Sequence, residues 1–206
     1  DLGGLPVDSR VTETLEAQRE VFEDLGCIVE EGFPDFTDAD EIFKTFRAWY
    51  FELKLASLLP EHREKMKETV IWNIESGMKL SGPELGRAEV KRTALFHRLR
   101  EFMKNYDFLA LPVSQVPPFP LEQEYVSEIN GMKMETYLDW MRSCYYITVT
   151  GQPAISVPSG FTNDGLPVGL QLVGRPQDDL GVLQLAYAFE KATGFYKKVP
   201  DLALTV

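Results

Sequence analysis

One segment constrains the fold of this chain more than any other: residues 151–174, GQPAISVPSGFTNDGLPVGLQLVG. Two apolar runs, "AISVP" and "VGLQLVG", flank "TNDGLP", in which an Asp-Gly pair favours a tight turn because glycine accepts a positive φ. Alternation along the second run places Val168, Leu170 and Leu172 on one face. The segment therefore predicts two strands joined by a turn.

Apolar residues at a helical period surround these strands. The predicted helices cover residues 8–26, 39–59, a stretch ending near 74, 85–103, 137–147 and a last one ending at Gly194. Asp8 is a predicted N-cap, as is Asp178 or Asp179, and Pro60 is predicted to end the second helix. Short strands are predicted at "CIVE" (27–30) and at "YDFLALP" (106–112), which has the pattern of a strand buried on both faces. This order predicts an α/β layered fold and a single domain over residues 1–206.

Residues 113–134 form a proline-rich connection between the predicted strand at 106–112 and the helix that follows. It is too long for an ordinary connector, and both a functional loop and a surface loop fit its length and composition.

Composition excludes several classes of protein. The chain is 44% hydrophobic, which supports a real core, and it has no apolar run of the roughly 18 residues that a membrane span needs. A net charge of −11 repels phosphate backbones, so we expect no direct nucleic-acid partner. The cysteines, Cys27 and Cys144, have no metal or redox spacing, and His62 and His97 are the two histidines, so we expect reduced thiols, no metal site and a cytoplasmic protein.

The sequence offers no local catalytic constellation. It has no G-x-S-x-G motif, and Ser156 and Ser159 have no His or Lys nearby, so we expect their hydroxyls to bond to backbone. We therefore assign no catalytic residue to this chain. Trp140, Tyr145 and Tyr146 precede the buried strand, and pocket and core positions are both open for them.

Three stretches carry a resemblance to a known family. "YDFLALP" and the later "TVTGQPAISVPSGFTNDGLPVGLQLVGRPQDDLGVLQLAYAFEKATG" resemble the C-terminal part of the amidase signature family. "DLGGLPVDSRVTETLEAQREVFEDLGCIVEE" is similar to the segment that follows the glycine- and serine-rich signature in those enzymes. Together these stretches cover most of the chain.

The resemblance implies hydrolysis of a small-molecule amide by a Ser–cis-Ser–Lys triad, on an α/β/α fold with a mixed central sheet and without a metal or organic cofactor. In the family the triad lies before the segment that this chain contains, so the chain is expected to complete the sheet and the substrate pocket and to be inactive alone. Two alternatives stay open: the glutamine-hydrolysing component of a glutamyl-tRNA amidotransferase, and a non-catalytic ligand-binding or interaction module.

Five residues are the predicted substrate-pocket positions: Arg92, Trp140, Met141, Tyr145 and Thr148. The resemblance places Met141 where the amidotransferase component carries a glutamine-binding Asp, and Thr148 where many members carry Asn. Arg92 falls where that component carries an Arg for the glutamine carboxylate, although a structural ion pair explains it equally. Because a sheet shared with further polypeptide exposes strand edges, we also expect self-association into a homo-oligomer.

Overall fold

The computed structural model describes residues 1–198, which form two compact units. The first, here called the sheet unit, contains Asp1–Pro34 and the chain from Arg100 onward. The second, the helical unit, contains Asp35–Leu99. The assignment of residues 1–206 to a single domain stays a prediction.

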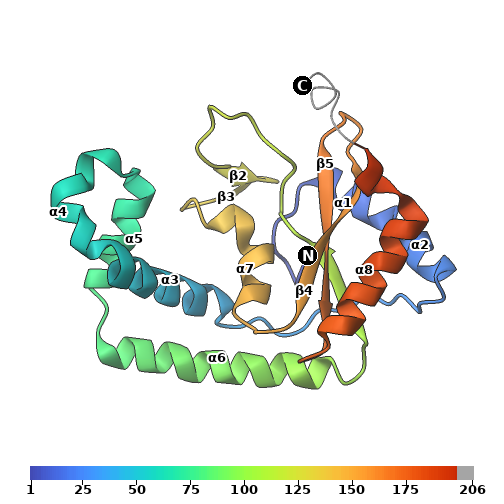
Figure 1. Ribbon diagram of the computed structural model, residues 1–206, viewed down its shortest axis with the longest axis horizontal. Coiled ribbons are helices and arrows are strands. Elements are labelled where there is room, and N and C mark those ends of the chain that lie inside the picture. The colour runs from blue at the N-terminus through green and yellow to red at the C-terminus, as the bar shows by residue number, and fades with distance from the viewer. Residues whose placement is uncertain (199–206) are drawn as a thin grey trace. The chain divides into compact units, whose positions relative to one another are not determined.

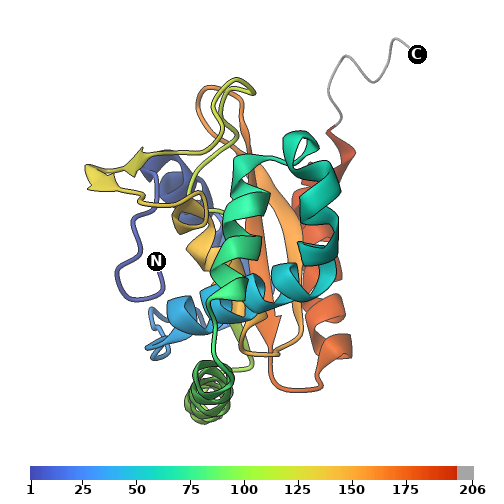
Figure 2. The same ribbon diagram turned by 90° about the vertical axis from the view of Figure 1, so that its left-hand side faces the viewer.

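The sheet unit is built on an antiparallel sheet with strand order β1-β5-β4. The strands are β1 (Phe108–Pro112), β4 (Ala154–Phe161) and β5 (Pro167–Gly174). A turn joins β4 to β5, with the Thr162 N–H donating to the Leu166 carbonyl over 2.8 Å and Gly165 at a φ of 84°. The predicted strands and turn are therefore confirmed, and β4 and β5 lie side by side in both views (Figures 1 and 2).

One face of this sheet, the α8 face, carries Ile155, Val157, Leu170 and Leu172. Helices α8 (Asp179–Thr193) and α2 (Arg19–Asp24) cover it, and both lie on the same side of the strands in Figure 1. The ring of Phe189 from α8, which is fully buried, stacks on Phe22 from α2 at 4.9 Å between centroids. The predicted boundaries of α8 are confirmed, because Asp178 accepts from the Gly181 N–H and Gly194 ends the helix at a φ of 66°.

The opposite face, the α7 face, is less uniform. The register places Leu111, Gln171 and Ser156 in one row across the sheet, and Leu109, Val173 and Ala154 in the next. The β1 and β5 members of these rows are buried, whereas Ala154 and Ser156 of β4 are exposed. Helix α7 (Arg142–Thr148) lies on this side, where the Ser143 hydroxyl donates to the Val113 carbonyl over 3.0 Å (Figure 1).

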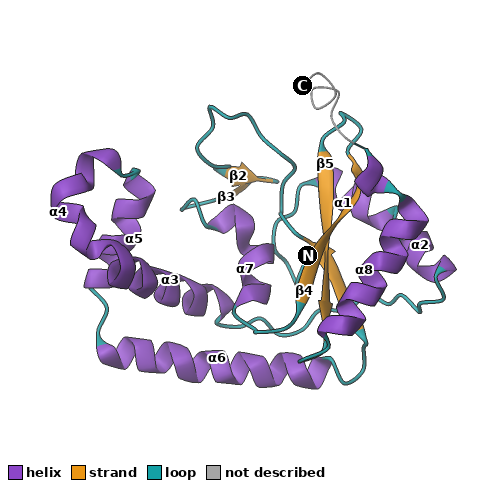
Figure 3. Cartoon of the chain, in the orientation of Figure 1, coloured by secondary structure: helices purple, strands orange, loops and turns teal. Residues whose placement is uncertain are grey.

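The proline-rich connection has structure of its own. It carries a small hairpin, β2 (Glu128–Ile129) and β3 (Met132–Lys133), followed by a 3-10 turn at Asp139–Met141 that leads into α7. Val116, Ile129 and Met134 form a buried cluster under this loop (Figure 3). The predicted helix over 137–147 therefore begins later than expected, at Arg142, after the 3-10 turn.

The helical unit consists of α3 (Ala39–Leu55), α4 (Leu59–His62), α5 (Glu68–Met78) and most of α6 (Gly82–Phe102). Gly77 lets α3 and α5 pack closely, because a Cβ there would overlap the Ala48 carbonyl. Pro60 does not end α3, which stops at Leu55; it lies in the first turn of α4, where its missing N–H costs nothing. The prediction for Pro60 was wrong.

Two predictions for residues 8–30 were also wrong. The first helix is broken into α1 (Ser9–Glu16) and α2, with Gln18 between them. Residues 27–30 form no strand, because within the described part of the chain no strand pairs with them. Their side chains still alternate as in a strand: Cys27 and Val29 pack against the core, and Ile28 is 91% exposed.

Candidate functional site

A cavity of about 320 Å³ opens on the α7 face of the sheet. Strand residues form its floor, and the proline-rich loop and Trp140 form its wall. Its lining residues are Val11, Val113, Ser114, Val116, Pro117, Pro118, Phe119, Trp140, Ser156, Pro167, Val168 and Gly169. No charged side chain is among them, so the cavity suits an apolar group of a small molecule.

An aromatic pair forms the wall. The rings of Trp140 and Phe119 meet edge to face, with centroids 5.3 Å apart and planes at 88°. Both side chains also pack on the buried cluster of Val116, Ile129 and Met134. The indole is therefore held in place by packing from the loop.

A buried polar network fixes the turn that carries Trp140. Asp139 is 2% exposed, and it accepts from the Thr136 N–H over 2.7 Å and from the Arg142 guanidinium over 2.8 Å. The Gln115 carboxamide accepts from the Arg142 N–H over 2.7 Å and donates to the Pro6 carbonyl over 2.9 Å. Sequence reasoning missed Gln115 and Asp139 as positioning residues. The Thr-x-x-Asp spacing at 136–139 was the available signal, whereas Gln115 and Pro6 lie 109 residues apart.

The floor of the cavity depends on a glycine. A Cβ at Gly169 would lie 3.1 Å from Cγ2 of Val113 and 3.3 Å from Oγ of Ser156. The absence of a side chain at this position therefore keeps the cavity deep. Ser156 contributes a hydroxyl to the floor, but no acid or base lines the cavity with it, so the arrangement does not activate a serine nucleophile.

The five predicted pocket residues are placed as follows. Trp140 lines the cavity. Tyr145 is 2% exposed and packs against Tyr146, Met141 is half-buried, and the exposed Thr148 donates its hydroxyl to the Cys144 carbonyl over 3.3 Å. These three lie in or beside α7 and are not among the lining residues.

Arg92 belongs to α6 in the helical unit. Its guanidinium lies 3.8 Å from the Glu89 carboxylate and 5.8 Å from the centroid of the Phe46 ring. These contacts fit the structural ion pair that the sequence left open. The substrate roles of all five residues stay predictions.

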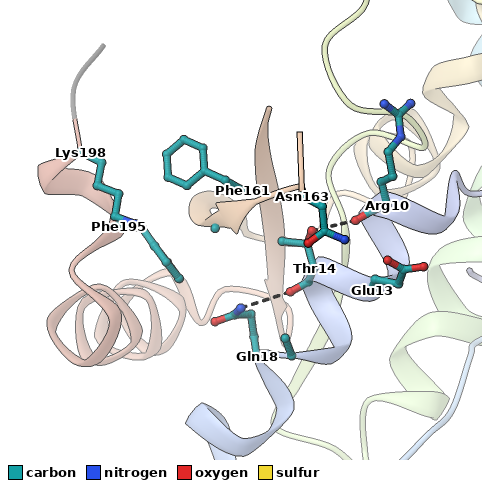
Figure 4. Close-up of a pocket in the computed structure, with 10 residues that line it drawn as sticks. Arg10, Glu13, Thr14, Gln18, Phe161, Asn163, Phe195 and Lys198 are labelled. Carbon is teal, nitrogen blue, oxygen red and sulfur yellow. Dashed lines mark hydrogen bonds between the residues drawn. The ribbon is translucent and has the colours of Figure 1, made fainter. Parts of the chain in front are cut away.

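A second cavity, of about 340 Å³, lies between α1, the β4–β5 turn and the 3-10 turn at Phe195–Lys197. Figure 4 shows Gln18 on α1 facing Phe195 across this space, with the Gln18 amide donating to the Thr14 carbonyl over 3.1 Å. Arg10 at its edge is held by Asp8 and Asp164 at 2.8 and 3.0 Å. The two cavities have no lining residue in common.

Within residues 1–198, no group of three or more His, Cys, Asp or Glu side chains could hold a metal ion. In the same range, no helix combines the length and the apolar character that crossing a membrane requires.

The fold and the first cavity define a class: an α/β protein with an apolar small-molecule pocket beside an antiparallel sheet. The chain belongs to the amidase family, whose model, described as Amidase, matches residues 5–183. The membership that the sequence motifs predicted is therefore confirmed.

Individual relatives agree with this assignment. The chain is 31% identical over its whole length to an acylamidase from Rhodococcus erythropolis, of which it covers 44%. It is 35% identical, over 56% of its length, to the A component of the glutamyl-tRNA(Gln) amidotransferase from Thermodesulfovibrio yellowstonii, of which it covers 23%. The chain thus spans less than half the length of these relatives.

Solved structures show the same fold. A bacterial aryl acylamidase of the amidase signature family superposes with a TM-score of 0.83 at 24% identity, over 96% of this chain and 43% of that one. A 6-aminohexanoate cyclic dimer hydrolase superposes with a TM-score of 0.79 at 19% identity, over 98% of this chain and 45% of that one. The predicted fold class is confirmed, with the strands of the sheet unit antiparallel.

Proposed function

We propose that this chain is the pocket-forming, C-terminal part of an amidase that hydrolyses the C–N bond of small aryl or aliphatic amides. The observation that carries the proposal is the cavity at Trp140, which is apolar, aromatic on one side and closed at the floor by strands. Such a cavity binds the apolar part of an amide and leaves the carbonyl to groups outside it.

The reaction itself requires residues that this cavity does not contain. A serine becomes a nucleophile when a base takes its proton and N–H groups receive the oxyanion. The cavity offers serine hydroxyls without a base, so the nucleophile and its base come from polypeptide outside this chain. The Ser–cis-Ser–Lys arrangement that the resemblance implies is the proposed source, and the isolated chain is proposed to be inactive.

The acylamidase assignment is supported over that of the amidotransferase component by two observations. The acylamidase match extends over the whole chain, whereas the amidotransferase match covers 56% of it. Position 141 carries a methionine and not the aspartate that would bind the glutamine substrate, and its side chain is half-buried.

A test uses the complete enzyme that contains this chain, with acetanilide and acetamide as substrates. We expect Trp140→Ala to raise KM for acetanilide about tenfold, which corresponds to about 1.4 kcal/mol, with a smaller effect on acetamide because only the aryl group reaches the indole. Trp72→Ala, at a 43% exposed position of α5, is the matched control and should leave both KM values unchanged.

The competing functions give different results in the same preparation. A fluorophosphonate probe should label a serine outside this chain; labelling of Ser156 or Ser159 would contradict the proposal. Hydrolysis of glutamine but not of acetanilide, together with co-purifying partner proteins, would favour the amidotransferase component. An upstream sequence without a lysine and a glycine- and serine-rich stretch would favour the binding module.

We also propose that the isolated chain self-associates in a cytoplasmic setting. Leu180, Leu183 and Tyr187 lie on the outer side of α8 and are 66%, 56% and 63% exposed. Apolar surface of this kind favours association. Light scattering at micromolar concentration should give the mass of a dimer or larger, and a compact monomer would contradict the proposal.

A further inference from the structure

The second cavity has the features of a built site that the proposed amidase function does not use. One side is formed by two rings, Phe161 and Phe195, with the Lys198 ammonium 5.1 and 5.6 Å from their centroids. The other side is α1, where Gln18 and Thr14 face the rings across the cavity (Figure 4). The space between them is therefore apolar on one side and polar on the other.

Gln18 supplies the decisive polar group. The side chain is 8% exposed, and its amide nitrogen donates to the Thr14 carbonyl, so the carbonyl oxygen Oε1 is turned away from the helix. Figure 4 shows this oxygen directed toward Phe195, and nothing in residues 1–198 donates a hydrogen bond to it. A largely buried acceptor without a donor is costly unless a ligand or water supplies one.

A strained glycine keeps the cavity open. Gly160 adopts a φ of 123°, at an irregularity in the pairing of β4 with β5. A Cβ at this position would lie 3.3 Å from Cγ2 of Thr14 and 3.4 Å from Cζ of Phe195. A side chain would therefore fill the gap between helix and ring, and glycine both allows the backbone conformation and leaves the space.

We propose that this cavity binds a flat aryl carboxamide. Its NH₂ group donates to Oε1 of Gln18, its ring packs against Phe161 and Phe195, and its carbonyl oxygen accepts from the Lys198 ammonium at the mouth. Each group of the ligand meets its complement: a donor faces the unpaired acceptor, a ring faces rings, and an acceptor faces a cation. This site is distinct from the cavity at Trp140, because the two share no lining residue.

The test measures binding of benzamide to the 206-residue chain by NMR titration, with methyl benzoate as the ligand control. Methyl benzoate keeps the ring and the carbonyl but has no N–H. For a ligand of this size we expect a dissociation constant on the order of 1 mM for benzamide. Methyl benzoate should bind about fivefold more weakly, as the loss of one hydrogen bond implies.

Two variants and a matched control locate the site. Gln18→Met keeps the volume and removes the acceptor, so benzamide should bind about fivefold more weakly while methyl benzoate is unaffected. Phe195→Leu should weaken both ligands. Gln184→Met changes an exposed glutamine of α8 and should alter neither affinity. Unfolding midpoints of all variants verify that each one is folded.

Several outcomes would overturn the proposal. These are no saturable binding of benzamide up to about tenfold above the expected dissociation constant, equal affinity of the two ligands, or chemical-shift changes confined to Trp140 and its neighbours. Binding that appears only when residues 199–206 are removed would also overturn it. None of these results bears on acetanilide hydrolysis by the complete enzyme, so this inference and the proposed function fail separately.

Discussion

The two faces of the sheet differ in how completely this chain covers them. On the α8 face, Leu170, Leu172 and Phe189 are all at most 4% exposed, and their neighbours come from α2 and α8 of the same chain. On the α7 face, Val173 is fully buried while Ala154 and Ser156 on the adjacent strand are exposed. One face is a closed core, and the other combines core, cavity and open surface.

The difference shows where structure and function are divided in this molecule. The α8 face has the dense apolar packing that stabilises a domain. The α7 face carries the cavity at Trp140, and its shape depends on polar networks, a glycine and a loop. Substitutions on the first face should therefore change the free energy of unfolding, and those on the second should change mainly what the protein binds.

The largest expected effect is on the α8 face. Phe189→Ala removes a fully buried ring that stacks on Phe22, and it should lower the free energy of unfolding by about 3–5 kcal/mol. Urea unfolding followed by circular dichroism measures the loss. Tyr187→Ala, at a 63% exposed position of the same helix, should change it by less than about 0.5 kcal/mol. Similar losses for both variants would show that α8 is not fixed on this face as described.

A pair of glycines on β5 compares the faces directly. A Cβ at Gly174 would lie 2.5 Å from Cγ2 of Val182 on α8, so Gly174→Ala should destabilise by about 1–3 kcal/mol through overpacking. Gly169→Ala meets Val113 and Ser156 at 3.1 and 3.3 Å, contacts that small shifts relieve, and alanine restricts the unfolded chain. We expect Gly169→Ala to stay within about 0.5 kcal/mol of the parent protein. The same thermal unfolding experiment measures both, and a reversed order would contradict the comparison.

Two buried glutamines sharpen it further. Gln115 is fully buried and bonded at both ends, so Gln115→Met should cost about 1–3 kcal/mol by leaving the Pro6 carbonyl and the Arg142 N–H unpaired. Gln152 precedes β4 and is 8% exposed, and its amide has no hydrogen-bond partner within the described chain. Gln152→Met should therefore leave stability unchanged or raise it by about 1 kcal/mol. A loss for Gln152→Met equal to that for Gln115→Met would mean that this amide is satisfied in solution.

The sequence predicted the α8 face well because its signals are local. Alternation in "VGLQLVG", the Asp-Gly turn and the limits of α8 at Asp178 and Gly194 all depend on residues close in sequence. The strand predicted at 27–30 failed for the opposite reason: the alternation is present, but a strand also needs a neighbour, and none pairs with it within residues 1–198.

The α7 face was harder to predict because its cavity is made by distant contacts. Trp140 and Tyr145 carried the same aromatic signal, yet the first lines the cavity and the second is 2% exposed in the core. What separates them is the turn at Asp139, which depends on Gln115 and, through it, on Pro6. No local pattern contains that link, so the sequence found the right element and could not rank its side chains.

The smallest expected effect concerns α1, which contributes Val11 to the cavity at Trp140. Asp8 caps this helix by accepting from the Arg10 N–H over 3.0 Å, and the Arg10 side chain, with burial opposing it, holds the pKa of the Asp8 carboxyl below its usual value. Asp8→Ala should cost about 1 kcal/mol at pH 7. Because the folded-state pKa is lowered, this stabilisation is present above the unfolded-state pKa of about 4 and is lost as pH falls below it. Urea unfolding at pH 7 and pH 3 should therefore show the difference between parent and variant shrinking at pH 3. Asp8→Asn, which can still cap, should lose less stability at pH 7 than Asp8→Ala, and a difference that persists undiminished at pH 3 would show that the carboxylate charge contributes nothing.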